Sequence, residues 1–270
     1  MLLSQRNQVF FFTAVWIKRL QRITKWYFSR TPYALTQSKN TFPFTVFSHQ
    51  TPLIRRLEGV DEQLQHNKVK NLKLASACLD GIVIHPGETF SFYRLVGFPH
   101  RFRGFLPGME LNRGKVRAGI GGGLCQIANL LHWMALHSPL TVKEHHHHSF
   151  DIFPDDGRIQ PFGSGATLFY NYLDYQLLNE TPFTFQLSLK VDEGYLKGQL
   201  LCSEALPAIY EVFEKNHAFI KQNGEFFRTN EIWRMEKDSE TDEEKSRYRI
   251  KKNWSKVMYI PKDYIDKDKL

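Results

Sequence analysis

A run of glycines in the middle of the chain, Gly119-Ile120-Gly121-Gly122-Gly123, limits the possible folds more than any other feature. Glycine loses more chain freedom on ordering than any other residue, so this run (the glycine loop) is predicted to be neither helix nor strand. The next segment, 124–137, has apolar residues at helical spacing and ends before Pro139. The chain is therefore predicted to leave the glycine loop directly into a buried helix.

Apolar periodicity divides the rest of the chain into one further helix and many short strands. The helix is predicted over residues 68–84, before His85-Pro86-Gly87. Strands are predicted at residues 89–93, 140–143, 145–153, 167–172, 183–191 and 195–202, with more after residue 208. The charged stretch 236–252 is predicted to be a solvated loop or surface helix. The predicted fold class is α+β, with two main helices packed on a mostly antiparallel sheet and a small β-rich C-terminal unit.

The positive charge lies near the N-terminus. The net charge is +8, and residues 1–60 account for all of it, with nine Lys or Arg and one acid. The remaining body is neutral, which argues against a nucleic-acid-binding protein. We predict three units: a basic N-terminal arm with a helix and a connector over 1–60, a central domain over 61–207, and a β-rich extension over 208–270.

The basic arm has an apolar side. On a helical wheel one face carries Phe12, Trp16, Leu20, Ile23 and Tyr27, with basic residues beside it. Two interpretations are open: a helix on an anionic membrane surface, or an ordinary helix docked on the domain. No segment reaches the roughly 20 apolar residues that span a bilayer, and the apolar run 9–16 is short for a signal-peptide core. The expected location is cytoplasmic, with peripheral membrane contact through the arm as one alternative.

Cys125 falls in the first turn of the helix that follows the glycine loop. The helix dipole favours a thiolate at such a position, and the thiolate is the nucleophilic form of cysteine. A cysteine hydrolase or acyltransferase would use Gln126 to stabilise an oxyanion and a histidine as its base. Asn171 or Asp174 is available to orient that base. The alternative is a small buried thiol that only packs.

Four consecutive histidines, 145–148, supply candidates for the base. In a strand His146 and His148 share one face, and either is a candidate base. With the thiol, the same imidazoles also form a plausible zinc shell, to which Asp151 or Glu144 would add an oxygen ligand. No other cofactor is expected, and the choice between base and metal ligand is open.

The glycine loop and its surroundings supply the candidate substrate contacts. Gly121, Gly122, Gly123 and Asn171 are predicted to border the pocket. Arg117, which precedes the loop, is a candidate contact for an anionic or carboxylate-bearing substrate, although a solvated position is the alternative. No Lys-Ser or Lys-Thr follows the glycines, so the loop is not a phosphate-binding P-loop.

Four motifs, in this order, resemble the VanW family. They are residues 86–92 (PGETFSF), 121–126 (GGGLCQ), 144–149 (EHHHHS) and 163–167 (GSGAT), the last followed by Asp174 and Asn179. The resemblance covers about residues 68–203. Many relatives carry Asp where Gly165 stands here, so any role of that Asp is either lost or supplied by Asp174.

This resemblance implies an accessory protein encoded with vancomycin-resistance genes and linked to cell-wall or peptidoglycan metabolism, without an established biochemical activity. The positions that it carries over are Gly121, Gly122, Gly123, Cys125, Gln126, His146, His148, Asp174 and Asn179. Three functions are open: a cysteine-dependent enzyme, a protein that binds a cell-wall precursor or another peptide or glycan without turnover, and a membrane-surface scaffold.

Overall fold

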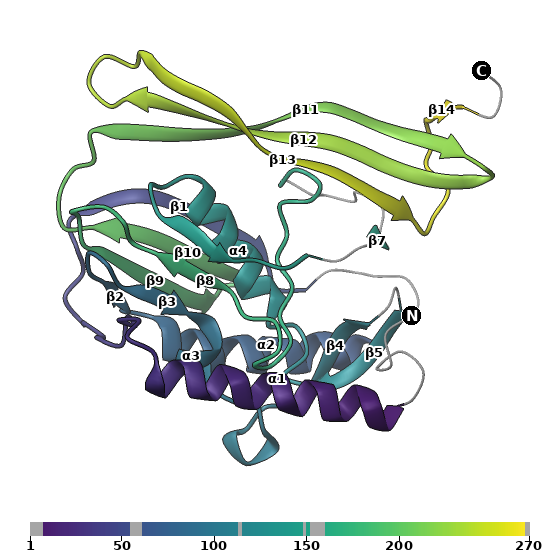
Figure 1. Cartoon of the computed structure of the whole chain (residues 1–270), viewed down its shortest axis with the longest axis horizontal. Helices are drawn as coiled ribbons and strands as arrows, with labels where there is room; N and C mark the ends of the chain where they lie inside the picture. The colour runs from purple at the N-terminus through teal and green to yellow at the C-terminus, as the bar shows by residue number, and fades with distance from the viewer. Residues whose placement is uncertain (1–7, 55–60, 113–114, 148–149, 152–159, 268–270) are drawn as a thin grey trace.

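The computed structural model describes residues 8–54, 61–112, 115–147, 150–151 and 160–267. Figure 1 shows a body of helices and small sheets, with a long sheet across one side and helix α1 (Gln8–Phe28) along the opposite side. Helices pack on mostly antiparallel sheets, which confirms the predicted α+β class. In the described ranges no helix has both the length and the apolar content needed to cross a membrane.

The largest sheet of the body is antiparallel throughout, in the order β1-β10-β9-β2. Its strands are β1 (Phe44–Pro52), β10 (Tyr195–Cys202), β9 (Phe185–Asp192) and β2 (Val83–Ile84). Glu193 and Gly194 close the β9–β10 hairpin at φ values of +48° and +83°, as a tight two-residue turn requires. The strand predicted over 195–202 is confirmed residue for residue.

The two predicted helices, α2 (Glu62–Leu79) and α4 (Cys125–Leu136), pack against this sheet and form the core with it. The side chain of Asp61 caps α2 by accepting from the Gln63 N–H at 2.9 Å, so the helix begins earlier than predicted. It also ends earlier, because Gly81 turns the chain at a φ of +77° and residues 83–84 become β2.

A smaller sheet has the order β3-β8-β6, and a hairpin leads into the glycine loop. The hairpin includes Gly119 and Ile120, so the prediction that the whole glycine loop lies outside strands is wrong for these two residues, which pair with Gly108 and Pro107. These elements are β3 (Thr89–Ser91), β8 (Gln176–Leu178), β6 (Thr141–Glu144), β4 (Pro107–Asn112), β5 (Lys115–Ile120), α3 (Phe92–Val96) and a 3-10 helix (Arg101–Arg103). The strand predicted over 167–172 is wrong, because Asn171 adopts a positive φ of 55° and makes a turn. The strand predicted over 145–153 is also wrong at its start, because 145–147 run outside any strand; of the described residues in this stretch, only Phe150–Asp151 (β7) are strand.

The long sheet consists of β11 (Ala208–Gln222), β12 (Glu225–Asp238) and β13 (Glu244–Val257), with β14 (Ile265–Asp266) and β7 at its edges. The loop or surface helix predicted over 236–252 is therefore wrong, since most of that stretch is strand. Opposite charges pair between β12 and β13, for example Arg249 with Glu231 at 2.9 Å. Such cross-strand pairs explain why mixed charge here accompanies a strand.

Candidate functional site

The glycine loop is packed tightly between α2 and the β4–β5 hairpin. Gly121 and Gly123 have φ values of +77° and +95°, which other residues rarely adopt. A Cβ on Gly122 would lie 2.2 Å from the backbone of Gly108. The buried side chain of Asn71 donates to the Gly122 carbonyl at 2.9 Å. These glycines are therefore required for close packing, and they fix where α4 begins.

Cys125 lies at the start of α4, with its sulfur against the backbone of Leu168. The Leu168 N–H donates to Sγ at 3.4 Å, and the thiol faces the Leu168 carbonyl at 3.9 Å. Burial raises the pKa of this thiol. Packing against the apolar core thus acts against the thiolate that the helix terminus favours. This environment favours the protonated thiol.

Gln126 joins α4 to β1. Its Nε2 donates to Thr51 Oγ1 and to the Pro52 carbonyl, both at 2.9 Å. An amide nitrogen carries two hydrogens, and these two contacts use both of them. In this arrangement Gln126 has no N–H available for an oxyanion.

Asp174 is buried between the small sheet and α3. Its Oδ2 accepts from Ser91 Oγ at 2.6 Å and from Gln176 Nε2 at 2.9 Å. Its Oδ1 accepts from the backbone N–H of Tyr93 at 3.0 Å. Burial raises the pKa of Asp174, and these hydrogen bonds act in the opposite direction. The carboxyl group thus connects β3, β8 and the first turn of α3.

Glu144, at the end of β6, connects Asp174 to α1 and to the histidines. Two N–H groups of Arg22 donate to its two oxygens. Nε2 of His146 and the backbone N of Asp174 each lie 3.0 Å from Oε1. Burial would raise the pKa of Glu144, but hydrogen bonds from His146 and Arg22 lower it to about 2. The carboxylate cluster, as we call it, consists of Arg22, Ser91, Glu144, His146, Asp174 and Gln176.

The other two described histidines of the run, His145 and His147, form a stack with His132 of α4. The rings of His132 and His145 lie 4.0 Å apart, and His147 stacks on His145 at 6.2 Å. Burial lowers the pKa of His145 to about 4 and that of His132 well below its usual value. The stacked imidazoles are therefore neutral at pH 7. His148 lies outside the described residues, and its role stays a prediction.

The His145 stack predicts an acid-sensitive fold. The pKa of His145 is about 4 in the folded chain and near 6.5 in the unfolded chain. Between these values the unfolded state binds the extra proton, so the free energy of unfolding decreases as the pH is lowered. From pH 7 to pH 5 this loss amounts to roughly 2 kcal/mol. In His145→Gln we expect the pH dependence of the unfolding free energy, measured in urea at both pH values, to shrink by that amount. The exposed His66→Gln is the control; an equal effect of both substitutions would contradict the assignment.

The zinc shell is not assembled from the described residues. Among them, no three His, Cys, Asp or Glu side chains are close enough to hold a metal ion. Asp151, a predicted oxygen ligand, instead accepts from Arg228 at 3.1 Å and from the Tyr259 hydroxyl at 2.9 Å, against the long sheet. The other predicted oxygen ligand, Glu144, belongs to the carboxylate cluster.

The remaining predicted site residues are held in contacts of their own. Arg117 pairs with Glu110 across the β4–β5 hairpin at 3.2 Å. Asn171 donates to the Arg19 carbonyl of α1 at 3.3 Å. Asn179 donates to two backbone carbonyls within the body. The structure thus brings Asp174 and His146 together through Glu144, whereas Arg117 and Asn171 lie with other partners.

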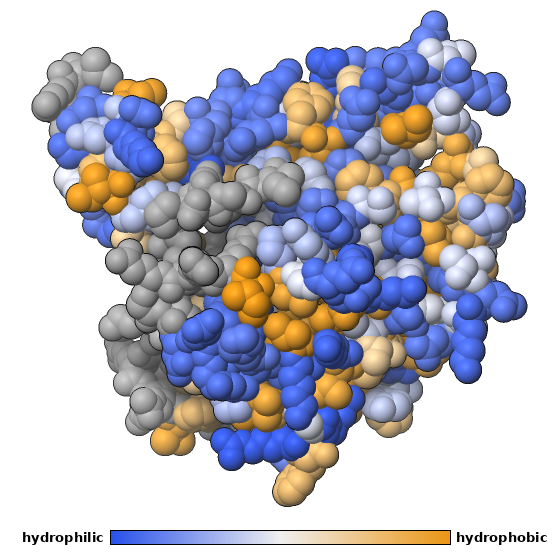
Figure 2. Space-filling model, turned by 180° about the vertical axis from the view of Figure 1, so that it is seen from behind, coloured by the Kyte–Doolittle hydropathy of each residue, from blue (hydrophilic) through white to orange (hydrophobic). Residues whose placement is uncertain are grey.

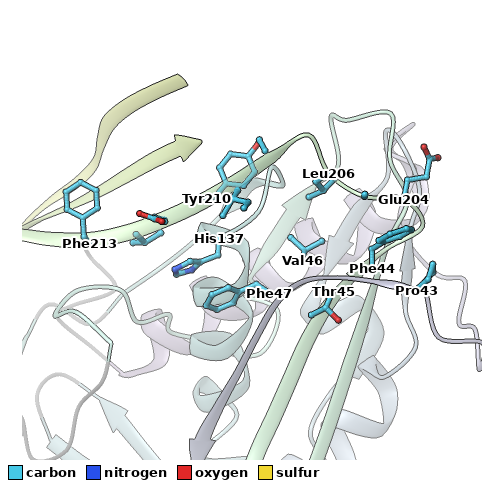
Figure 3. Close-up of a pocket in the computed structure, with 15 residues that line it drawn as sticks. Pro43, Phe44, Thr45, Val46, Phe47, His137, Glu204, Leu206, Tyr210 and Phe213 are labelled. Carbon is cyan, nitrogen blue, oxygen red and sulfur yellow. The ribbon is translucent and has the colours of Figure 1, made fainter. Parts of the chain in front are cut away.

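A cavity of about 710 Å³ lies where the long sheet meets the body. From behind, Figure 2 shows hydrophobic residues gathered along this junction. The cavity is lined by Pro43–Phe47, His137, Glu204–Leu206 and Ala208–Phe213. Figure 3 shows Phe47 and His137 side by side, with Tyr210 and Phe213 on the strand across from them; the Phe47 and His137 rings stack at 3.9 Å.

Sequence reasoning missed this cavity and the partner of Glu144. The cavity joins residues more than 150 positions apart, and no motif marks them. Arg22 lies 122 residues from Glu144 and was assigned only to the basic arm. His137, the cavity residue on the α4 side, donates from Nδ1 to the Trp133 carbonyl at 2.9 Å. No local signal in the sequence points to either site.

The comparisons with known proteins agree with the motifs. The family described as VanW like protein matches residues 67–201. The vancomycin B-type resistance protein VanW of Enterococcus faecalis is 33% identical over 204 residues, which are 76% of this chain and 74% of that protein. The chain belongs to the VanW family.

A second relative of this VanW-family chain is more distant. The uncharacterized protein YoaR of Bacillus subtilis is 27% identical over 110 residues, which are 41% of this chain and 35% of that protein. No solved structure matches the chain significantly. Within the VanW match lie Cys125, Glu144 and Asp174, but Arg22 and every cavity-lining residue except His137 fall outside it. The cavity is thus built mainly from segments that flank the VanW domain.

Proposed function

We propose that this protein contributes to resistance against antibiotics of the vancomycin type by binding a cell-wall precursor peptide without turnover. The observation that carries the proposal is the 33% identity to the enterococcal vancomycin B-type resistance protein over three quarters of both chains. We place the binding on the cytoplasmic side of the membrane, where precursors are made. Three free cysteines, none of them in a disulfide, suit that reducing compartment.

The chemistry at Cys125 favours binding over catalysis. A cysteine nucleophile needs a thiolate, an imidazole base and a free oxyanion donor. Here burial raises the pKa of the thiol, and the sulfur contacts the backbone of Leu168. His146 is engaged with Glu144, and both N–H bonds of Gln126 are used. These contacts describe a structural role for the residues around the glycine loop.

The cavity beside the long sheet suits an extended peptide. Within the described residues β1 pairs with β10 alone, and β11 before Ile220 pairs with β12 alone, so both strands that line the cavity have an open edge. A peptide strand can add its main-chain hydrogen bonds to such an edge. The lining also offers acceptors that suit a peptide with an amino group: Glu204, Nε2 of His137, and the second oxygen of Glu211, whose Oε1 pairs with Lys237 at 2.9 Å.

Titration of the purified chain with synthetic muramyl pentapeptide tests this site. Leu206→Trp narrows the cavity with a larger side chain, and we expect it to weaken binding at least tenfold in calorimetry. Leu35→Trp makes the same change at an exposed position away from the cavity and should leave the affinity unchanged. Equal affinity in both variants would place the peptide elsewhere.

Resistance itself is measured in cells that depend on this chain for growth in vancomycin. We expect Cys125→Ser to keep the full resistance level, because the thiol has no chemical step to perform. Leu206→Trp should lower it toward that of cells without the protein. Loss of resistance in a Cys125→Ser protein that folds normally would contradict the binding function and favour the cysteine-dependent enzyme.

A further inference from the structure

Helix α1 presents a long apolar face to solvent. Val9, Phe12, Trp16, Leu20, Ile23 and Tyr27 recur every three or four residues, and each is at least 36% exposed. Phe10, Ile17 and Phe28 widen this face, with exposures of 52%, 53% and 85%. A surface helix of a globular domain normally turns its apolar stripe inward and its charges outward. In α1 most apolar side chains instead face solvent, and among its described residues only Val15 and Trp26 are buried.

The contacts that hold α1 on the body explain this exposure. Two apolar side chains of the helix, Val15 and Trp26, are buried against the body. The polar contacts come from its charged side: Arg22 binds Glu144, and Nε of Arg19 donates to the Tyr170 carbonyl at 3.2 Å. Near the end of the helix, Arg94 donates to the Trp26 carbonyl at 2.7 Å. Since these contacts fix α1 between Arg19 and Trp26, the apolar face of this helix is directed away from the body.

A second segment presents an aromatic side chain next to α1. Phe102, in the 3-10 helix, is 96% exposed. The same loop is joined to α1 through Phe98, which packs on Tyr170 at 4.5 Å and lies 5.7 Å from the Arg19 guanidinium. Figure 1 shows this loop projecting past α1, on the side away from the sheets. Two segments that are far apart in sequence therefore expose apolar groups at one edge of the molecule.

Positive charge accompanies this edge. Lys18 and Lys25 on α1, Arg30 after it and Arg101 beside Phe102 are all exposed, and α1 contains no Asp or Glu. A helix is about 10–12 Å thick, close to the Debye length of about 10 Å at 0.1 M salt. A negatively charged surface in contact with the apolar face would therefore attract the cations on every side of α1.

We propose that α1 and Phe102 bind the surface of a bilayer that contains anionic phospholipids, with α1 lying in the membrane plane. The exposed face is rich in Trp, Tyr and Phe, which favour the boundary between water and lipid. Next to this face Phe102 is almost fully exposed, and a fluid bilayer accepts such a side chain without a preformed pocket, whereas a second copy of this chain would need a matching hollow. This binding is independent of the peptide function proposed above.

Flotation of the full chain with vesicles tests the proposal. We expect binding to vesicles of equal parts phosphatidylglycerol and phosphatidylcholine, and at least tenfold weaker binding to pure phosphatidylcholine. Leu20→Glu should weaken binding to the anionic vesicles at least tenfold, and Phe102→Glu at least threefold. Tyr248→Glu introduces the same charge at a half-exposed position of β13 and should bind like the original protein.

Three results would overturn the proposal. One is unchanged vesicle binding by Leu20→Glu, and another is equal binding to both kinds of vesicle. The third is a dimer in light scattering that Leu20→Glu converts to a monomer while no vesicles bind, which would assign the face to a second copy. Because Leu20 is 64% exposed, Leu20→Glu should melt at the same temperature as the original chain, so a folding defect is distinguishable from lost binding.

Discussion

Asp174→Ala is expected to lower the free energy of unfolding by about 3–5 kcal/mol. The carboxyl group accepts three hydrogen bonds in the buried interior, from Ser91, Gln176 and the Tyr93 N–H. Alanine would leave these three donors buried without an acceptor, and the strands that they join would lose a common anchor. Urea unfolding followed by circular dichroism measures the loss directly.

Glu180→Ala provides the control for this prediction. It also removes a carboxylate that accepts a hydrogen bond, from the Thr141 hydroxyl at 2.5 Å, but this pair is exposed to solvent. Its removal should cost less than about 0.5 kcal/mol, because water replaces the lost contact. A loss of less than about 1 kcal/mol in Asp174→Ala would show that the carboxylate cluster does not hold the fold together.

Gly122→Ala should cost about 3 kcal/mol or prevent folding, because an added methyl group would overlap rigid backbone. The new Cβ would lie 2.2 Å from the backbone of Gly108, and neither chain can withdraw easily while Asn71 bonds the Gly122 carbonyl. The yield of soluble protein and its urea midpoint measure this effect.

Gly165→Ala is the matched control for the glycine loop. A Cβ there would meet only the side chain of Asn129, whose Oδ1 lies 3.3 Å and whose Cγ lies 3.9 Å away, and a side chain can shift. We expect a loss below about 1 kcal/mol. Similar losses at both positions would mean that the loop moves to accept the methyl group, and that its glycines are not fixed by packing.

The pattern of apolar residues in the sequence was sufficient to predict those helices and strands whose structure depends on residues close in sequence. The helix after the glycine loop and the β10 strand were predicted to within a residue, because their buried side chains recur at the helical or the strand period. The stretch 236–252 failed for the opposite reason. Its charges are balanced by partners on the neighbouring strand, such as Glu231 for Arg249, and that pairing has no local signal.

At the candidate site, the sequence motifs predicted which residues lie in the site better than they predicted the roles of those residues. The motifs marked Cys125, Gln126, His146 and Asp174, but the surroundings of each side chain decide what it does. Burial raises the pKa of the Cys125 thiol, which opposes the effect expected from the helix terminus. The partner that fixes Glu144 is Arg22 of α1. The sequence pattern indicated that α1 lies on a membrane or on the domain surface, but it did not indicate which residue of α1 makes the contact.

The distance in sequence between Arg22 and Glu144 has a consequence for synthesis of the chain. Translation adds roughly 5–20 residues per second, so the 122 residues that separate the two partners take roughly 6–24 s to make. During that interval Arg22 of the newly made α1 lacks its carboxylate partner. The helix thus has time to meet a bilayer or a chaperone before the body that will hold it is complete.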